Sequence, residues 1–111
     1  MKIILICFLL FFARCSSDDK PVEPKNLIEK NKMTVIMGEI ILLESYFQHT
    51  FGVPSNYKSA LTLSSEKVFK KFGVTAKSYE DSFRFYAQQY EVFHEMNKVI
   101  IERQNKKLLD L

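Results

Sequence analysis

The sequence predicts an all-α protein, a small bundle of three to four helices placed after an N-terminal leader and tether. Apolar residues recur every three or four positions between residues 33 and 47, which is the spacing of one helix face. Glycines at positions 52 and 73 each follow such a run and mark its end. Aromatic residues recur at helical spacing between residues 79 and 90. The length of 111 residues suits a single domain.

The N-terminal segment has the features of a secretory signal. Residues 1–12, MKIILICFLLFF, contain one Lys and otherwise only apolar residues. This run is shorter than the roughly 20 apolar residues that span a bilayer as a helix, but it fits the basic start and apolar centre of a signal peptide. A buried N-terminal strand or helix is the alternative, which the lack of polar alternation before Arg14 disfavours. We therefore expect residues 1–14 to be a removed signal peptide.

Cys15 ends this segment, in a stretch that resembles the lipobox of bacterial lipoproteins. Ala13 fits the lipobox pattern, whereas Phe12 stands for the usual Leu and Arg14 for a small residue. The resemblance implies that Cys15 carries a thioether-linked diacylglycerol and an N-acyl chain such as palmitate, and no other cofactor is expected. The second cysteine, Cys7, lies inside the signal, so the mature chain can form no internal disulfide.

The charge of the chain gives no reason to expect a nucleic acid partner. The full chain has a net charge of +3, and loss of Lys2 and Arg14 with the signal leaves 14 basic against 13 acidic residues, a net charge of +1. A chain so close to neutrality has no broad basic surface for nucleic acid or anionic lipid.

A short polar stretch and a proline-containing linker follow the cysteine. The polar stretch resembles the acidic export signal of Bacteroidota lipoproteins that reach the outer face of the outer membrane, which implies cell-surface exposure, with the periplasmic face as the alternative. Its residues are Ser16, Ser17, Asp18, Asp19 and Lys20. We expect residues 15–25 to form the lipidated Cys and a flexible linker, extended by its prolines, and residues 26–111 to form the helical domain.

The first predicted helix runs from Leu27 or Glu29 to Gln48 and ends before Gly52 and Pro54. Its core face is expected to consist of Met33, Ile36, Met37, Ile40, Leu43 and Phe47. Glu44 falls within this face. We expect it to be hydrogen-bonded to a Tyr or Lys or to lie at the edge of the face; a functional carboxylate is the alternative.

The same helix has a second apolar stripe nearly opposite the first, formed by Val35, Leu42 and Tyr46. A helix that is apolar on two sides is either central in its bundle or covered by a partner. These three residues are therefore candidate partner contacts.

The second predicted helix spans Ser65 to Phe72 and follows a polar connection over Ser55 to Ser64. Gly73 fits the position just past a helix that ends in a Schellman motif, with Val74 and Phe69 as its apolar pair.

Thr75 is a candidate N-cap for the third predicted helix, from Ala76 to Gln88. Its inward face is expected to comprise Tyr79, Phe83, Tyr86 and Tyr90. Phe85 points away from that face, which makes it a further candidate partner contact, with a lone exposed or helix-covered Phe as the alternative. The fourth predicted helix spans Glu91 to Leu109, and its inward residues are expected to be Phe93, Met96, Ile100 and Leu108.

Two sequence features, a helix-turn-helix pattern and the two histidines, are weak evidence for DNA binding or catalysis. Residues 67–79 have the Gly and N-cap of a helix-turn-helix, but the second helix carries two acids and few base-reading side chains. The two histidines, His49 and His94, are far apart and have no cluster of ligands around them in the sequence. We therefore expect neither DNA binding, nor a metal site, nor an enzyme.

Several blocks of the chain resemble a family of small Bacteroidota lipoproteins catalogued as a domain of unknown function. The most specific block is FGVTAKSYEDSFRFY over residues 72–86, and others are PKNLI at 24–28, IMGEIILLE at 36–44 and VIIER at 99–103. The sequence departs from the family pattern at Gln88-Gln89-Tyr90, where the family commonly has a Pro. A continuous or kinked long helix in place of the third and fourth predicted helices is therefore an alternative.

The resemblance implies a lipid-anchored helical module of the envelope, similar to accessory lipoproteins of outer-membrane machines such as the β-barrel assembly machinery. We expect a non-enzymatic docking or scaffold subunit whose partner is an outer-membrane β-barrel protein or another envelope lipoprotein. Twelve Phe and Tyr residues after the signal exceed what a small core can hide. The first alternative is a freestanding chaperone-like or ligand-binding lipoprotein, and the second is a solitary inhibitor or immunity-type lipoprotein.

Overall fold

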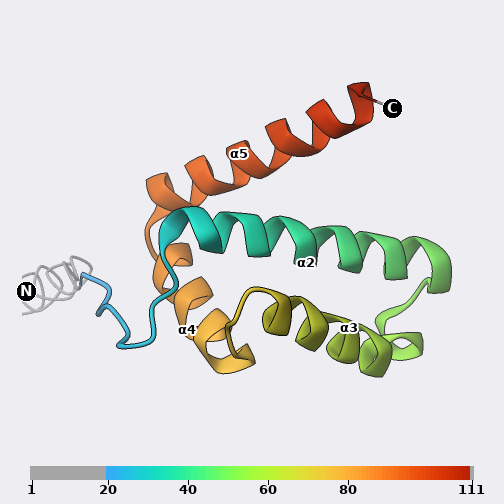
Figure 1. The fold of residues 1–111 in the computed structure, drawn as a ribbon, viewed down its shortest axis with the longest axis horizontal. Coiled ribbons are helices and arrows are strands. Elements are labelled where there is room, and N and C mark those ends of the chain that lie inside the picture. The colour runs from blue at the N-terminus through green and yellow to red at the C-terminus, as the bar shows by residue number, and fades with distance from the viewer. Residues whose placement is uncertain (1–19, 111) are drawn as a thin grey trace, which may run out of the picture.

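A computed structural model describes residues 20–110. Its elements are α2 (Lys30–Phe51), a 3₁₀ turn η2 (Pro54–Asn56), α3 (Lys58–Lys71), α4 (Ala76–Ala87) and α5 (Tyr90–Leu109). Figure 1 shows α2 in the middle, α3 and α5 on opposite sides of it, and α4 at the end nearer the N-terminus. The described residues contain no strand, and the predicted all-α bundle is confirmed.

The core forms on the predicted face of α2. Met33, Ile36, Met37 and Ile40 are buried there, and they pack with Phe69 of α3, Tyr86 of α4, and Met96 and Ile100 of α5. Phe47 is also buried and Leu43 is half-buried. The predicted face is thus confirmed, because the three- and four-residue spacing places these side chains on one side of a helix.

Both ends of α2 are capped by the residues that flank it. The Glu29 carboxylate accepts hydrogen bonds from the backbone N–H groups of Asn31 at 2.9 Å and Lys32 at 3.0 Å. These bonds hold the pKa of Glu29 below its usual range. At the other end Gly52 adopts a φ of 80°, and its N–H donates to the Gln48 carbonyl. Most other residues resist that left-handed backbone.

The helix α3 begins seven residues before the predicted start at Ser65, so the expectation of a loop up to Ser64 was wrong. The cause is tertiary packing. Tyr57, just before α3, is buried, and its ring lies 5.9 Å from the ring of Phe47. This contact fixes the start of α3 against α2, where the Leu61 N–H donates to the Tyr57 carbonyl at 2.8 Å.

The connection between α3 and α4 has the predicted Schellman geometry. The Val74 N–H donates to the Phe69 carbonyl at 2.9 Å, and the Gly73 N–H donates to the Lys70 carbonyl at 3.1 Å. Gly73 has a φ of 68°. Thr75 then caps α4, since its hydroxyl accepts from the Ser78 N–H at 3.0 Å.

The helices α4 and α5 are separate, with a break at Gln88 and Gln89. Three residues expected to point inward are exposed: Phe83, Tyr90 and Leu108. Phe83 instead makes an edge-on contact with Phe93, with ring centroids 5.4 Å apart. The inward positions of α4 are taken by Ser78, Ser82 and Tyr86, because small residues let α4 approach the segment before α2.

That segment, residues 24–29, forms a strap across α4. The Ile28 N–H donates to the Ser82 hydroxyl at 2.9 Å, and the Ile28 carbonyl accepts from the Tyr86 hydroxyl at 2.7 Å. Asn26 donates to the Asp81 carboxylate at 3.3 Å, which with the nearby Lys77 holds the pKa of Asp81 below its usual range. The end of the predicted linker therefore lies against the folded domain.

The helices α2 and α5 contact each other at Gly38 and Ile100. A β-carbon at Gly38 would lie 3.7 Å from Cγ2 of Ile100, an ordinary contact distance. Beyond this point the two helices diverge (Figure 1). On α5 the residues after Ile100 are exposed as far as Asp110, apart from the half-buried Gln104.

Removal of the strap's hydroxyl partner should destabilise the domain. Ser82 is fully buried, so Ser82→Ala leaves the Ile28 N–H without a partner. We expect a loss of about 1–3 kcal/mol in the free energy of unfolding. Urea titration followed by circular dichroism measures it. The control is Ser45→Ala on the exposed side of α2, expected to change stability by less than about 0.5 kcal/mol. Equal effects of the two variants would contradict the role of the strap.

Two glycines should respond in opposite ways to the same substitution. Gly38→Ala adds a methyl group that fits against Ile100 and removes a helix-interior glycine, so we expect a gain of about 0.4–1 kcal/mol. Gly73→Ala forces a β-carbon into the left-handed region, so we expect a loss of about 1–2 kcal/mol. The same urea titrations report both, and loss of stability in Gly38→Ala would mean that α2 and α5 lie closer than described.

Candidate functional site

The predicted second stripe of α2 is uncovered in the structure. Val35 is 39% exposed, Leu42 is 46% exposed and Tyr46 is 61% exposed. These three residues lie on the side of α2 that none of the other helices covers completely. We call them the α2 stripe.

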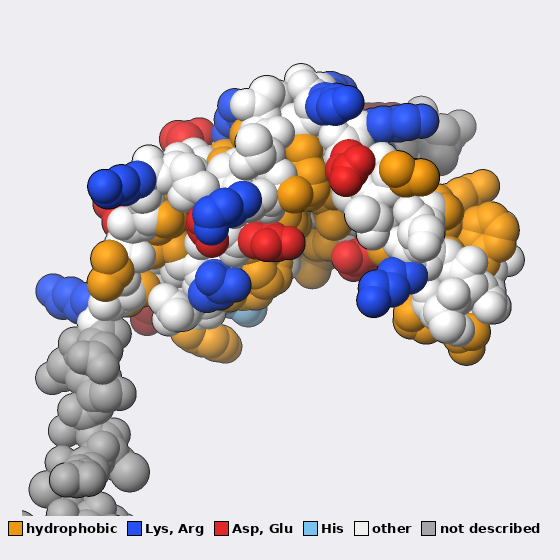
Figure 2. All heavy atoms as spheres, turned by 90° about the horizontal axis from the view of Figure 1, so that it is seen from below, with side chains coloured by type: hydrophobic (Ala, Val, Ile, Leu, Met, Phe, Trp, Pro, Cys, Tyr) orange, Lys and Arg blue, Asp and Glu red, His pale blue; other side chains and the backbone are white. Residues whose placement is uncertain are grey.

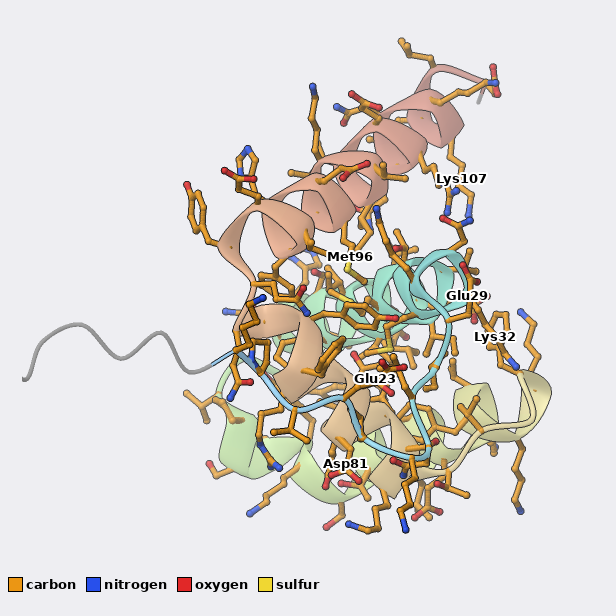
Figure 3. The ribbon with its side chains drawn as sticks, turned by 90° about the vertical axis from the view of Figure 1, so that its left-hand side faces the viewer. Glu23, Glu29, Lys32, Asp81, Met96 and Lys107 are labelled. Carbon is orange, nitrogen blue, oxygen red and sulfur yellow. The ribbon has the colours of Figure 1, made fainter. Side chains whose placement is uncertain are left out.

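A groove lies beside the α2 stripe, where α2 and α5 diverge. Its volume is about 270 Å³. Val35, Gly38, Leu42 and Ile100 supply its apolar surface. Figure 3 shows Lys107 reaching from α5 on the side that faces α2. The full lining consists of Thr34, Val35, Gly38, Glu39, Leu42, Ile100, Arg103, Gln104, Lys106, Lys107 and Asp110.

The rim of the groove is rich in hydrogen-bond donors. Arg103, Lys106 and Lys107 come from three positions of α5, and none of them forms a salt bridge with another residue of the range 20–110. On the α2 side the charge of Glu39 is already paired, since Lys71 lies 2.9 Å from its carboxylate. Gln104 adds a buried side-chain nitrogen that has no hydrogen-bond partner among the described residues.

The α2 stripe continues into an aromatic tip at the far end of the bundle. The ring of Tyr46 lies 5.7 Å from that of Phe47, which lies 5.6 Å from Phe51. Phe51 and Val53 are exposed around this point. Figure 2 shows hydrophobic side chains gathered at this end, away from the N-terminus.

Phe85 does not lie on this surface, and the expectation that it points away from the core was wrong. It is half-buried, packs against the core cluster, and its ring lies 5.4 Å from that of Tyr86. The reason is the strap, which the helical pattern of α4 alone does not reveal. An open cavity of about 610 Å³ lies between residues 20–24 and α4, and Phe85 forms part of its lining.

The remaining predicted site residues fall into two groups. Lys20 is exposed and lines the cavity beside Phe85. Cys15, Ser16, Ser17, Asp18 and Asp19 lie outside the described residues.

Glu44 lies at the edge of the core face, exposed, and is not within it. Its charge affects a neighbour: burial, with a smaller contribution from Glu44, raises the pKa of Tyr79 to about 12. His49 and His94 are also exposed, and His94 stacks on Tyr90 with ring centroids 5.9 Å apart. Residues 20–110 contain no group of three His, Cys, Asp or Glu side chains placed to hold a metal ion.

Sequence reasoning missed the α5 side of the groove. The signal was present: Gln104 follows Ile100 by four residues, so a polar side chain continues the buried line of α5 just where three cations gather. The angle at which α5 leaves α2 depends on packing between the two helices, which the sequence of α5 alone does not encode.

The burial of Tyr79 predicts a pH dependence of stability. Its phenol holds its proton up to about pH 12 in the folded protein and up to about pH 10 in the unfolded chain. The folded state therefore binds more protons in this window, and the stability present below pH 10 is lost as the pH rises toward 12.

Tyr79→Phe should make this loss shallower, since the phenol whose pKa burial raises to about 12 is removed, while the Tyr86 phenol, whose pKa burial also raises, still contributes. Urea titrations between pH 9 and 12 measure it, and Tyr90→Phe, at an exposed ring, is the control. A profile for Tyr79→Phe as steep as that of the unsubstituted chain would contradict the assignment.

Comparisons with known proteins place most of the chain in one family. No described helix is long and apolar enough to cross a membrane. No curated protein matches the sequence, and no solved structure matches the fold. A family model described as a domain of unknown function, DUF4296, matches residues 24–108, from the strap to the end of α5. The chain therefore belongs to the DUF4296 family.

Proposed function

We propose that this protein is a lipid-anchored, non-enzymatic docking subunit of the bacterial envelope, held at the outer membrane through Cys15. The observation that carries the proposal is the uncovered α2 stripe. A small domain has room for few side chains in its core. Here three apolar side chains of the central helix are exposed to solvent. A contiguous apolar surface of this kind is typical of a protein–protein contact.

The position of the strap supports a role that depends on orientation. Lys20 lies five positions after Cys15, a reach of at most about 17 Å when fully extended. The strap then holds the chain to α4 through the two hydrogen bonds of Ile28. A domain anchored at Cys15 is thereby kept near the bilayer, and the end of α2 that carries the aromatic tip lies away from α4 (Figure 1).

The outer leaflet is the proposed location, because the Ser-Ser-Asp-Asp-Lys stretch resembles a surface-export signal. The periplasmic leaflet is the alternative. The partner is proposed to be an outer-membrane β-barrel protein or a neighbouring lipoprotein, and the specific version that we favour is a subunit of the β-barrel assembly machinery. This version rests on the resemblance to accessory lipoproteins.

The dimensions of the groove favour docking over the alternative of a freestanding ligand-binding or chaperone-like lipoprotein. Its volume of about 270 Å³ is below the range of roughly 300–1,000 Å³ that small-molecule sites occupy. The larger cavity beside the strap is wide open and is lined by charged residues such as Asp81 and Arg84. Neither hollow offers the enclosed apolar volume that a ligand carrier needs.

The test is an affinity purification from outer membranes solubilised in mild detergent. The chain carries a C-terminal tag on a long Gly/Ser linker, which keeps the tag away from α5. Recovery of an envelope protein in a fixed ratio to the tagged chain supports the docking function. Recovery of the tagged chain alone would shift the assignment to the freestanding alternative. Protease treatment of intact cells, compared with lysed cells, reports the leaflet.

Tyr46→Ala should weaken partner recovery without unfolding the domain. Tyr46 is 61% exposed, so its removal costs little packing and shifts the melting temperature by no more than a few degrees. An aromatic contact residue is worth about 1–2 kcal/mol, so recovery should fall about fivefold to thirtyfold. Tyr90→Ala, the same substitution at an exposed site on α5, should leave recovery unchanged. Equal recovery of both variants would exclude Tyr46 from the interface.

A further inference from the structure

The groove between α2 and α5 has a chemical bias that goes beyond a general apolar surface. Its floor is apolar, and its rim carries Arg103, Lys106 and Lys107 with Asp110 as the one unpaired acid of the lining. The buried nitrogen of Gln104 is a further donor without an acceptor among the described residues. A buried donor of this kind costs free energy until an acceptor reaches it. Within residues 20–110 the groove thus carries more unpaired donors, on Arg103, Lys106 and Lys107, than unpaired carboxylates, of which Asp110 is one.

We propose that the groove takes an acidic amphipathic helix of the partner protein. The inference rests on the proposed docking function and names the chemistry of the bound segment. Apolar side chains at positions i, i+3 or i+4, and i+7 of that helix pack on Val35, Leu42 and Ile100. Carboxylates on its flank pair with the cations of α5, and one oxygen accepts from Gln104. Such a helix-in-groove mode is common in peptide recognition.

The length of the groove fits a helix of two to three turns. Val35 and Leu42 are seven residues apart on α2, which is about 10 Å along the helix axis. Ile100 and Lys107 are also seven residues apart on α5. A third helix in this opening contacts α2 on one side and α5 on the other, and it thereby covers the α2 stripe over the same length.

The exposure of the last turns of α5 also favours a partner in the groove. From Ile101 to Asp110 every described residue is exposed except Gln104, which is half-buried. A helical stretch of about ten residues is marginal in water without tertiary contacts. A helix seated in the groove supplies those contacts along the last turns of α5.

Two other occupants fit the groove less well. A second copy joined across a two-fold axis would bring the same face of each subunit together, so Arg103, Lys106 and Lys107 would face their own copies. An anionic lipid satisfies the cations with its headgroup, but it brings no row of apolar side chains to match Val35 and Leu42 at their seven-residue spacing. Both occupants are distinguishable in the experiment that follows.

The experiment is site-specific photo-crosslinking in intact cells that express the full-length protein. A benzophenone amino acid replaces Val35 or Leu42 in separate strains, and Glu66 on the exposed side of α3 is the control position. Mass spectrometry identifies the cross-linked peptide. We expect both groove positions to capture one segment that has apolar residues at i, i+3 or i+4, and i+7 and Asp or Glu on its flank, at yields well above the control.

A charge reversal separates the electrostatic part of the proposal. Lys106→Glu combined with Lys107→Glu should lower the cross-linking yield about twofold to thirtyfold, the range expected for loss of two exposed ion pairs. The matched control is Lys67→Glu combined with Lys70→Glu on α3, which changes the net charge equally at exposed positions. Equal yields for the two double variants would overturn the role of the rim.

The other possible cross-linking results each overturn the proposal of an acidic helix in the groove. Cross-links to a lipid, to a second copy, or to a segment without acidic residues overturn the inference, and so does a yield no higher than at Glu66. The purification described above distinguishes this failure from failure of the docking function. A stoichiometric partner without cross-links in the groove leaves docking in place through another surface, whereas absence of both removes the two proposals together.

Discussion

The fold depends on the buried face of α2. Met33, Ile36 and Met37 are almost completely buried, and each such side chain contributes about 1.5–3 kcal/mol when removed from water. The other three helices all pack against α2, with α3 and α5 on opposite sides and α4 at one end. Because α4 packs at one end of α2 and α5 diverges from it along its length, one side of α2 stays open. The α2 stripe is therefore a consequence of the way the core is built.

Sequence patterns predicted the parts of the fold that are stabilised by contacts between residues close together in the sequence. Gly73 with Val74 and the N-cap Thr75 could be assigned from sequence because their hydrogen bonds join residues only three to five positions apart. The start of α3 could not, because it depends on the contact of Tyr57 with Phe47 across the bundle. Nor did the sequence indicate Ser82, whose burial makes sense only once Ile28 of the strap is placed on α4.

The candidate site divides in the same way. Val35, Leu42 and Tyr46 were visible in the sequence because a strongly periodic helix shows both of its apolar sides. Phe85 was misassigned because a segment more than 50 residues away, the strap, lies over its helix. The cations of α5 read as an ordinary polar helix end until the divergence of α2 and α5 placed them along an apolar groove. Interfaces between elements are thus the part that sequence periodicity does not reach.

The small size of the groove is compatible with the proposed docking if the proposed lipid anchor at Cys15 is present. A free protein must recover the whole cost of association from its interface, several kcal/mol of lost translational and rotational freedom. A protein tethered to the same membrane as its partner meets it at a high effective concentration, so a modest contact suffices. The strap adds to this effect, since its bonds to Ser82 and Tyr86 hold residues 24–29 on α4 and so shorten the free part of the proposed tether. On this view the short tether and the limited apolar stripe belong together: the tether supplies proximity, and the groove has to supply only specificity.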